Sequence, residues 1–257
     1  MNAKVQRPQV FYLRRAKTCR KNLLARVTPR TLHDFRTCLR RLEAFLRLEK
    51  PLLGKTRYRD SIIRIKNMRK WTGPLREAFV TSAILKTAGL SSRKKVLMPG
   101  GIESGKEKAF QTLLSDRSLG QFFSYMESML GNLDQRAERK KTQRIIRKIF
   151  MKEVSRLRQA LKAYHLKGPG PKVLHLLRIR SKRLRYDLEQ FDFLHPHRRK
   201  KLLKAVSRVH DALGRLRDLR TAEKGADEES LRILSAQENG LRCDAIESIH
   251  RLDKVMV

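Results

Sequence analysis

The sequence predicts an all-α protein, and three of its features indicate this fold class. Apolar residues recur at helical spacing in nearly every segment between glycines and prolines, and no segment alternates apolar and polar residues as a half-buried strand would. A motif from the first part of the chain returns in its second part. Hydrophobic residues make up 40% of the 257 residues, which is sufficient for a real core. We therefore expect a helical protein built from two similar halves.

Prolines and glycines bound the expected helices of the first half. Thr28 and Pro29 can start a helix, because proline is favoured at the first helical position, and Pro51 and Gly54 end it. Gly73 and Pro74 interrupt the next helical stretch, and glycines punctuate the segment 89–105. The helices predicted for this half cover about 9–24, 30–48, 58–71, 74–88, 106–130 and 133–165.

The strongest break in the chain is the run Gly168-Pro169-Gly170-Pro171. Beyond it we expect helices near 172–194, 197–222 and 227–254. The chain is thus expected to form a single domain over residues 1–257, with internal repeats at about 28–167 and 172–257.

The repeated motif places a histidine among strong bases. Residues 32–42 read Leu-His-x-Phe-Arg-x-x-x-Arg-Arg-Leu, and residues 174–184 read Leu-His-x-Leu-Arg-x-x-x-Lys-Arg-Leu, 142 positions later when counted from His33 to His175. A second motif, at 73–77, returns at 214–218 with an offset of 141. Two motifs that keep nearly the same spacing predict two similar helical bundles related by a pseudo-two-fold axis, each contributing one His-Arg helix to a shared basic groove.

A helix turns about 100° per residue, so each copy of the first motif separates into an apolar and a polar stripe. The apolar stripes contain Leu32, Phe35, Leu39, Leu42 and Leu46 in the first copy, and Leu174, Leu177, Leu184, Leu188 and Phe191 in the second. The polar stripes contain His33, Arg36, Arg40 and Arg47, and His175, Arg178, Lys182, Arg185 and Glu189.

The charge of the chain predicts an anionic partner. The net charge is +36, from 61 Lys and Arg against 25 Asp and Glu, which exceeds what solubility requires and destabilises the fold through self-repulsion. Nucleic acid, an anionic membrane surface and polyphosphate all remain open on charge alone. An arginine guanidinium can bind two phosphate oxygens at once. Basic side chains at i and i+4 of a helix lie about 5–6 Å apart, which is close to the charge repeat of a phosphate chain.

Several residues near the polar stripes have two possible roles. His33 and His175 either donate hydrogen bonds to phosphate or are satisfied within a helix interface. Tyr186 either offers its hydroxyl to an anion or packs between helices. Glu77 and Asp218 are expected to brace arginines arriving from a neighbouring helix.

No catalytic, metal-binding or cofactor-binding residue is predicted. Gly100, Gly105 and Lys106 resemble part of a P-loop, but Glu107 stands where the loop needs Ser or Thr, and we expect Ser104 to cap a helix instead. Neither a nucleophile elbow nor a metal helix is visible, so we expect a protein that is not an enzyme.

The compartment expected from the sequence is the cytoplasm. The three cysteines are widely spaced and form no Cys-x-x-Cys pair, which indicates neither a disulfide framework nor a zinc site. No apolar run of about 18 residues exists, and no secretory signal is recognisable.

Taken together, these motifs resemble the CHAD domain, the conserved histidine α-helical domain, over about residues 10–255. The residues that carry the resemblance are the two His-Arg motifs and Leu213-Gly214-x-Leu216-x-Asp218. The resemblance implies two four-helix bundles around a basic central channel that binds inorganic polyphosphate. Some members of that family locate to polyphosphate or polyhydroxyalkanoate granules, and some carry a catalytic domain whose Glu-x-Glu-x-Lys signature is missing from this chain.

The resemblance also implies the binding residues. Carried over by position, and joined by Tyr186 and the arginines of the second motif, they are His33, Arg36, Arg40, Arg41, His175, Arg178, Lys182, Arg183, Arg185, Tyr186, Arg76 and Arg217. The chain departs from the family pattern at Glu43, Glu77 and His210. Because a base is usual at position 43, we expect the first half to be the weaker anion site.

Two functions follow as expectations from these residues. The first is a stand-alone polyphosphate-binding protein without catalysis. The alternative is an RNA- or ribosome-binding helical protein, for which the chain has few aromatic residues, 6% in all, and none on the basic stripes.

Overall fold

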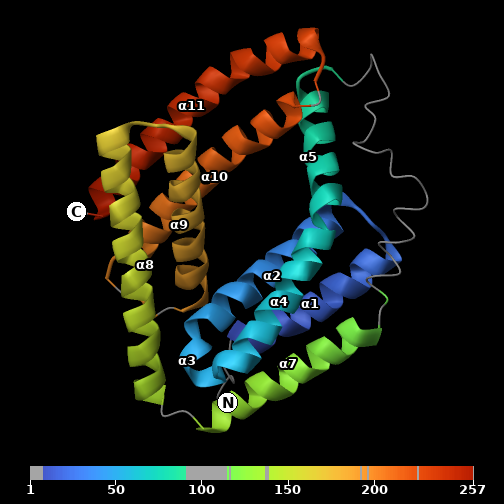
Figure 1. Ribbon diagram of the computed structural model, residues 1–257, viewed down its shortest axis with the longest axis vertical. Helices are drawn as coiled ribbons and strands as arrows, with labels where there is room; N and C mark the ends of the chain where they lie inside the picture. The colour runs from blue at the N-terminus through green and yellow to red at the C-terminus, as the bar shows by residue number, and fades with distance from the viewer. Residues whose placement is uncertain are drawn as a thin grey trace, which may run out of the picture. The chain divides into compact units, whose positions relative to one another are not determined.

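The computed structural model describes residues 8–90, 115, 117–136, 139–191, 193–195, 197–224 and 226–256 (Figure 1). Ten α-helices account for almost all of these residues, and none of the described residues lies in a strand. The predicted all-α class is therefore confirmed. The pseudo-two-fold relation and the channel stay predictions.

The chain divides into two compact units, which we describe separately. Unit 1 comprises Met1–Phe79 and Gly100–Ile146. Its helices are α1 (Pro8–Ala25), α2 (Pro29–Leu48), α3 (Lys50–Leu53), α4 (Lys55–Trp71) and α7 (Arg117–Arg136), together with the beginnings of α5 (Gly73–Thr87) and α8 (Arg139–Lys167). Helix α2 packs against both α1 and α4, and α7 packs against α1.

Helix α2 begins at Pro29, as the sequence predicts, and the structure adds a capping box at this start. The Thr28 hydroxyl accepts a hydrogen bond from the Thr31 backbone N–H at 3.1 Å, and the Thr31 hydroxyl accepts one from the Thr28 backbone N–H at 2.9 Å. Pro29 occupies the first helical position. This cap fixes where the His-Arg motif begins within the helix.

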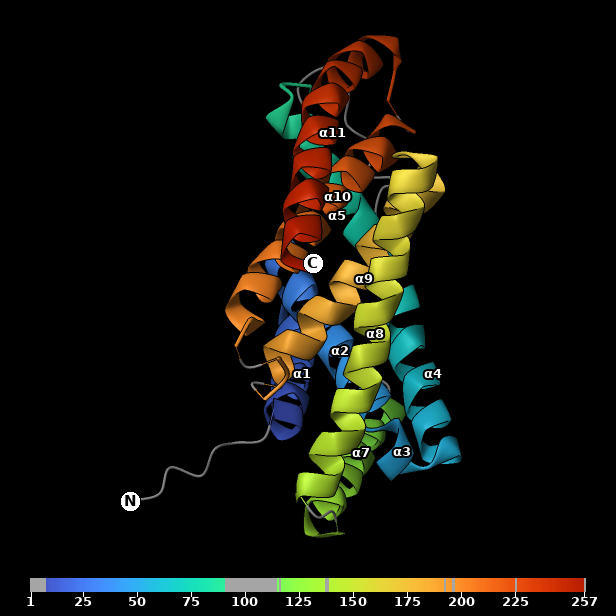
Figure 2. The same ribbon diagram turned by 90° about the vertical axis from the view of Figure 1, so that its left-hand side faces the viewer.

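Unit 2 comprises Val80–Pro99 and Arg147–Val257. Its helices are α9 (Pro171–Gln190), α10 (Arg199–Glu223) and α11 (Glu228–Met256), with the later parts of α5 and α8. Helix α10 packs against both α9 and α11 (Figure 2). Arg158 of α8 donates two hydrogen bonds, of 3.2 and 2.9 Å, to the Met256 carbonyl oxygen near the end of α11.

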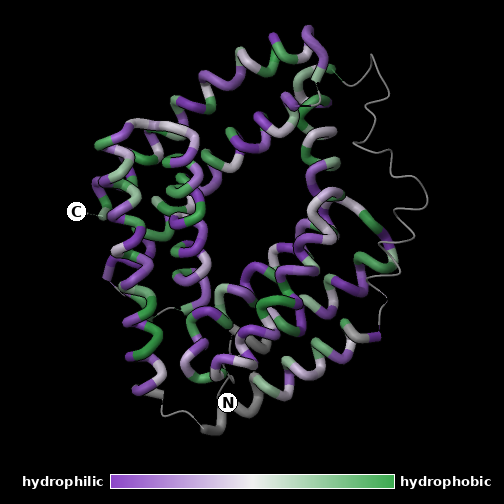
Figure 3. The backbone as a smooth tube through the Cα atoms, in the orientation of Figure 1, coloured by the Kyte–Doolittle hydropathy of each residue, from purple (hydrophilic) through white to green (hydrophobic). Residues whose placement is uncertain are grey.

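The predicted apolar stripes are buried, which confirms the helical period. All five apolar residues of the first copy are at most 1% exposed, and those of the second copy are at most 7% exposed. Figure 3 shows the corresponding change between hydrophobic and hydrophilic residues along the helices. Packing of these stripes supplies most of the drive to fold, since the apolar area removed from water dominates folding.

Some boundaries differ from the predicted ones. The four-residue helix α3 was not expected, and α7 continues through Gly131 to Arg136 instead of ending near residue 130. The two units divide within α5 and α8, not at the Gly-Pro run that separates the sequence repeats. The P-loop-like segment with Ser104 and the predicted start of a helix at 106 lie outside the described residues.

The cysteines remain thiols. Cys19 and Cys38 are buried with their sulfur atoms 3.9 Å apart, whereas Cys243 is exposed. Burial, followed by the neighbouring Cys19, raises the pKa of the Cys38 thiol to about 12. Among the described residues, no helix is long and apolar enough to cross a membrane.

Candidate anion-binding clusters

Unit 1 gathers four arginines from three helices around one buried side chain. We call Arg36, Arg40, Arg69 and Arg76 the Arg36 cluster. Arg36 is only 8% exposed, and its Nη1 donates hydrogen bonds to the Arg69 carbonyl oxygen, at 2.6 Å, and to the Thr72 hydroxyl. These two bonds anchor the α2 guanidinium against the end of α4, where α5 begins.

The pKa of Arg36 shows how crowded this cluster is. Burial first, and then the charges of Arg40, Arg69 and Arg76, lower that pKa to about 10. Glu77 acts in the opposite direction, so this carboxylate lies close enough to favour the charged guanidinium, as the predicted bracing role requires. Four like charges held this close would be stabilised by a multivalent anion.

Glu43, which the sequence marks as the weak point of the first half, has a specific partner. Its carboxylate pairs with the Arg69 guanidinium, and both side chains are about three-quarters buried. The pair balances one charge of the Arg36 cluster and holds α2 against α4. The negative charge of Glu43 is therefore largely neutralised by Arg69, so its repulsion of a bound anion is weakened.

The other predicted residues of the first motif lie apart from this cluster. The Arg41 guanidinium stands over the Tyr12 ring of α1, 5.1 Å from its centroid. This follows from helical geometry, because position 41 is turned about 100° from position 40. His33 is exposed, with its Nε2 3.4 Å from the Thr37 hydroxyl.

In unit 2 the corresponding arginine, Arg178, lies over a glycine of the next helix. A Cβ atom at Gly214 would be 3.9 Å from Arg178 Nη2 and 4.0 Å from its Nε. Gly214 thus leaves room for the guanidinium to lie against α10. The first motif of this half, at Arg178, thus lies against the second motif, at Gly214.

Arg185 forms a dense polar group with α10 and with its own helix. Its Nε donates to Glu189 Oε1 at 2.9 Å, and its Nη1 donates to Asp211 Oδ1 at 2.8 Å. The Nδ1 atom of His210 is 3.2 Å from both Arg185 Nη1 and Asp211 Oδ1. We call Arg178, Arg185, His210 and Asp211 the Arg178 group.

These contacts shift three pKa values. Burial lowers the pKa of His210, the charges of Arg178 and Arg185 lower it further, and Asp211 opposes them. The hydrogen bond from His210, with the charge of Arg185, lowers the pKa of Asp211. Burial alone would lower the pKa of Arg185, but Glu189 and Asp211 outweigh it and the pKa is raised. Arg185 is therefore a firmly charged but locally balanced cation.

The remaining predicted residues of unit 2 divide between surface and interior. Arg183 approaches Glu153 of α8 at 3.8 Å, and Tyr186 is 7% exposed, within the core. His175 and Arg217 are exposed, and Lys182 is half-buried. Arg183 and Arg41, which occupy equivalent positions of the motif, thus both lie against a neighbouring helix.

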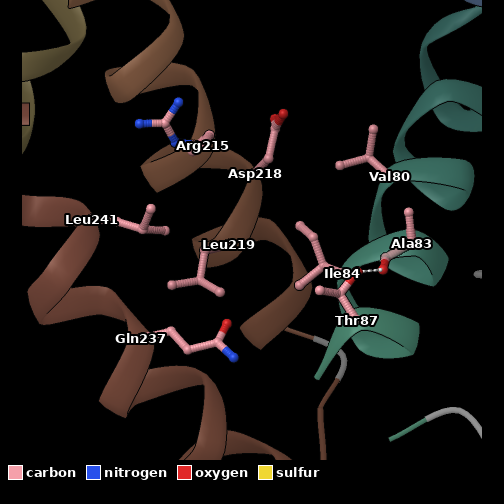
Figure 4. A pocket seen from close by; sticks show the side chains of 9 residues that line it. All are labelled: Val80, Ala83, Ile84, Thr87, Arg215, Asp218, Leu219, Gln237 and Leu241. Atoms are coloured by element: carbon pink, nitrogen blue, oxygen red, sulfur yellow. Dashed lines mark hydrogen bonds between the residues drawn. The ribbon is translucent and has the colours of Figure 1, made fainter. Parts of the chain in front are cut away.

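Asp218, the counterpart of Glu77, lines a cavity of about 320 Å³ between α5, α10 and α11 (Figure 4). Most of the lining is apolar and includes Ile84, Leu219 and Leu241, while Arg215 and Asp218 are its charged members. The cavity adjoins the small core that Leu85 forms with α10 and α11. Among the described residues, no group of three His, Cys, Asp or Glu side chains is placed to hold a metal ion.

The structure therefore brings together Arg36, Arg40 and Arg76 in unit 1, and Arg178 and Arg185 in unit 2. Sequence reasoning missed Arg69, Thr72 and Asp211, which complete these arrangements. The sequence contains one hint about Arg69. It lies 141 positions before His210, which is the offset of the second motif, so the two residues occupy equivalent positions of the repeat.

The fold and these clusters define an all-α protein with arginine-bearing helices in both units. A profile of the CHAD domain matches residues 12–224. The chain belongs to the CHAD domain family, and the resemblance seen in the sequence is confirmed.

A solved structure supports the same fold. The crystal structure of the CHAD domain from the plant Ricinus communis is similar with a TM-score of 0.63 and 18% sequence identity, over 95% of this chain and 87% of that one. A search of curated proteins found none that matches.

Proposed function

We propose that this CHAD domain binds inorganic polyphosphate without changing it. The observation that carries the proposal is the Arg36 cluster, in which burial and three neighbouring arginines depress the pKa of Arg36. A polyanion at this position would relieve the repulsion and favour the charged guanidinium. The CHAD family resemblance implies the same ligand, and the net charge of +36 supports a polyanionic one.

Phosphate contacts suit these residues better than base recognition does. Arginine forks bind phosphate oxygens in pairs, and the Arg178 group adds a second set of guanidinium groups in unit 2. RNA is the alternative, and one residue favours it: Trp71 is 39% exposed and lies between Arg69 and Thr72 in the sequence, where its ring could stack on a base. The proposal includes a cytoplasmic or granule-associated location for the protein.

Trp71 also provides the test. It is the only tryptophan of the chain, so its fluorescence reports on the end of α4, where Arg69 and Thr72 also lie. Long-chain polyphosphate should change this fluorescence and should displace RNA of equal total charge at physiological salt. Preference for RNA in this competition would overturn the proposed ligand.

Matched variants separate a built site from bulk charge. Arg40→Gln with Arg76→Gln should weaken polyphosphate binding at least about tenfold, because two members of the cluster lose their charge. Lys55→Gln with Lys66→Gln removes the same charge from exposed positions of α4 and should weaken binding about twofold or less. Equal losses would contradict a specific site. Release of inorganic phosphate during incubation with divalent cations would contradict binding without catalysis.

A further inference from the structure

Equivalent positions of the sequence motifs are in contact in both units, but their side chains carry different charges. Position 43 of α2 corresponds to position 185 of α9 by the first offset, and position 69 of α4 corresponds to position 210 of α10 by the second. In unit 1 the contact joins an acid to an arginine, Glu43 to Arg69. In unit 2 it joins an arginine to a histidine, Arg185 Nη1 to His210 Nδ1 at 3.2 Å. An arginine of α4 is thus replaced in α10 by a histidine.

The neighbouring positions follow the same exchange. Arg47 and Lys70 of unit 1 correspond to Glu189 and Asp211 of unit 2. Both of these carboxylates bind Arg185, at 2.9 and 2.8 Å. The positions around this contact therefore carry mainly positive side chains in unit 1, whereas in unit 2 positive and negative side chains nearly cancel. This removes the reason for expecting unit 2 to be the stronger site at neutral pH.

His210 is held between charged groups, so a change in its own charge alters the electrostatics of the Arg178 group. Its side chain is 13% exposed, its Nδ1 lies between Arg185 and Asp211, and its buried Nε2 has no hydrogen-bond partner in the described part of the protein. The charges that act on it are Arg178 and Arg185 of α9 and Asp211 of α10. On the side of α10 that faces α11, the charged pairs are Arg215 with Asp244 and Arg220 with Glu238, further along the helix.

Burial and the two arginines lower the pKa of His210, so the imidazole is neutral at pH 7 when no anion is bound. A phosphate chain held by Arg178 would offset the arginine charges and bring negative charge close to the ring. Both effects favour the imidazolium form. Since the anion favours the proton, the proton must favour the anion to the same extent.

We propose that His210 is a positioning residue that links anion binding in unit 2 to the uptake of a proton, whereas the equivalent place in unit 1 holds Arg69, which pairs with Glu43. The inference rests on the proposed function and specifies how one of its two clusters is regulated. Polyphosphate affinity should rise as the pH falls below neutrality and should level off above about pH 7.5, where the imidazole stays neutral in both states.

Long-chain polyphosphate is the probe for the test. Isothermal titration calorimetry in two buffers of different ionisation enthalpy measures proton uptake directly. Between about pH 7.5 and about pH 5.5 the wild-type affinity should rise about threefold to tenfold, since a tenfold change corresponds to a shift of one pKa unit. His210→Gln should lose this rise and most of the proton uptake. His197→Gln removes an exposed histidine of the same unit and should retain both.

A second measurement follows the ring itself. In NMR titrations of the histidine side chains, polyphosphate should move the titration midpoint of His210 to higher pH, an effect that a purely structural role would not produce. His210→Arg gives unit 2 the residue type that Arg69 provides in unit 1. At about pH 7.5 this variant should bind polyphosphate at least as tightly as the wild type does at about pH 5.5, and its affinity should not depend on pH.

Two results would overturn the inference. If polyphosphate binds but His210→Gln keeps the wild-type pH profile and proton uptake, His210 does not link them, and the proposed function stands. If polyphosphate fails to bind at every pH, both the inference and the proposed function fail.

Discussion

Glu153 is a buried carboxylate surrounded by arginines in unit 2. It is 2% exposed, and its oxygens lie 2.5 Å from Arg156, 3.5 Å from Arg180 and 3.8 Å from Arg183. The first arginine belongs to α8, and the other two belong to α9. One acid therefore joins two helices and compensates the repulsion among three cations.

Removing this acid should destabilise unit 2. We expect Glu153→Ala to lower the free energy of unfolding by about 1–2 kcal/mol, because three partly exposed arginines lose their buried counterion. Urea unfolding followed by circular dichroism measures the change. The exposed pair of Glu247 with Arg251 supplies the control, and Glu247→Ala should cost about 0.5 kcal/mol or less. Similar losses in the two variants would show that burial of Glu153 adds nothing.

At the level of elements, a glycine lies where the Arg178 guanidinium of α9 meets α10. Gly214 is buried in the middle of α10, beneath the guanidinium of Arg178. A methyl group would make ordinary van der Waals contact there, whereas a larger side chain would displace the arginine. The position therefore controls where the first arginine of the second motif lies.

Substitutions at two helical glycines test this arrangement. Gly214→Leu should weaken polyphosphate binding several-fold, because it moves Arg178 away from α10. Gly240→Ala, in open space within α11, should raise the free energy of unfolding by about 1 kcal/mol through helix propensity alone and should leave binding unchanged. Calorimetric titration with polyphosphate and thermal unfolding separate the two effects. Unchanged binding in Gly214→Leu would contradict the role given to the glycine.

The helices were largely predictable, because their signals are local. The apolar period, the Thr28 cap and the breaks at Gly54, Gly73 and Gly168 lie within the segments that they define. Helix α7 passes through Gly131 since one glycine costs a helix only about 1 kcal/mol.

The clusters were only partly predictable from the same sequence. The helical period places Arg36 and Arg40 on one face, and it could also have separated Arg41 from them. It could not show that Arg69 of α4 reaches the same place, because contacts between helices depend on packing that no local pattern encodes.

For the whole molecule, the positive charge predicts strong dependence on salt. If a phosphate chain neutralises the four arginines of the Arg36 cluster, its affinity should fall about 100-fold between about 50 and about 200 mM salt, by the counterion-release rule established for nucleic acids. Binding titrations over this range measure the slope. A slope near zero would show that the cations are not the contacts.

The exchanged contact between Glu43 with Arg69 and Arg185 with His210 also constrains how such chains can evolve. Replacing Glu43 alone by arginine would set it against Arg69, and replacing Arg69 alone by histidine would leave the carboxylate with a partner that is mostly uncharged at neutral pH. Passage from one arrangement to the other is easiest when both positions change together. Positions 43 and 69 should therefore covary among related chains.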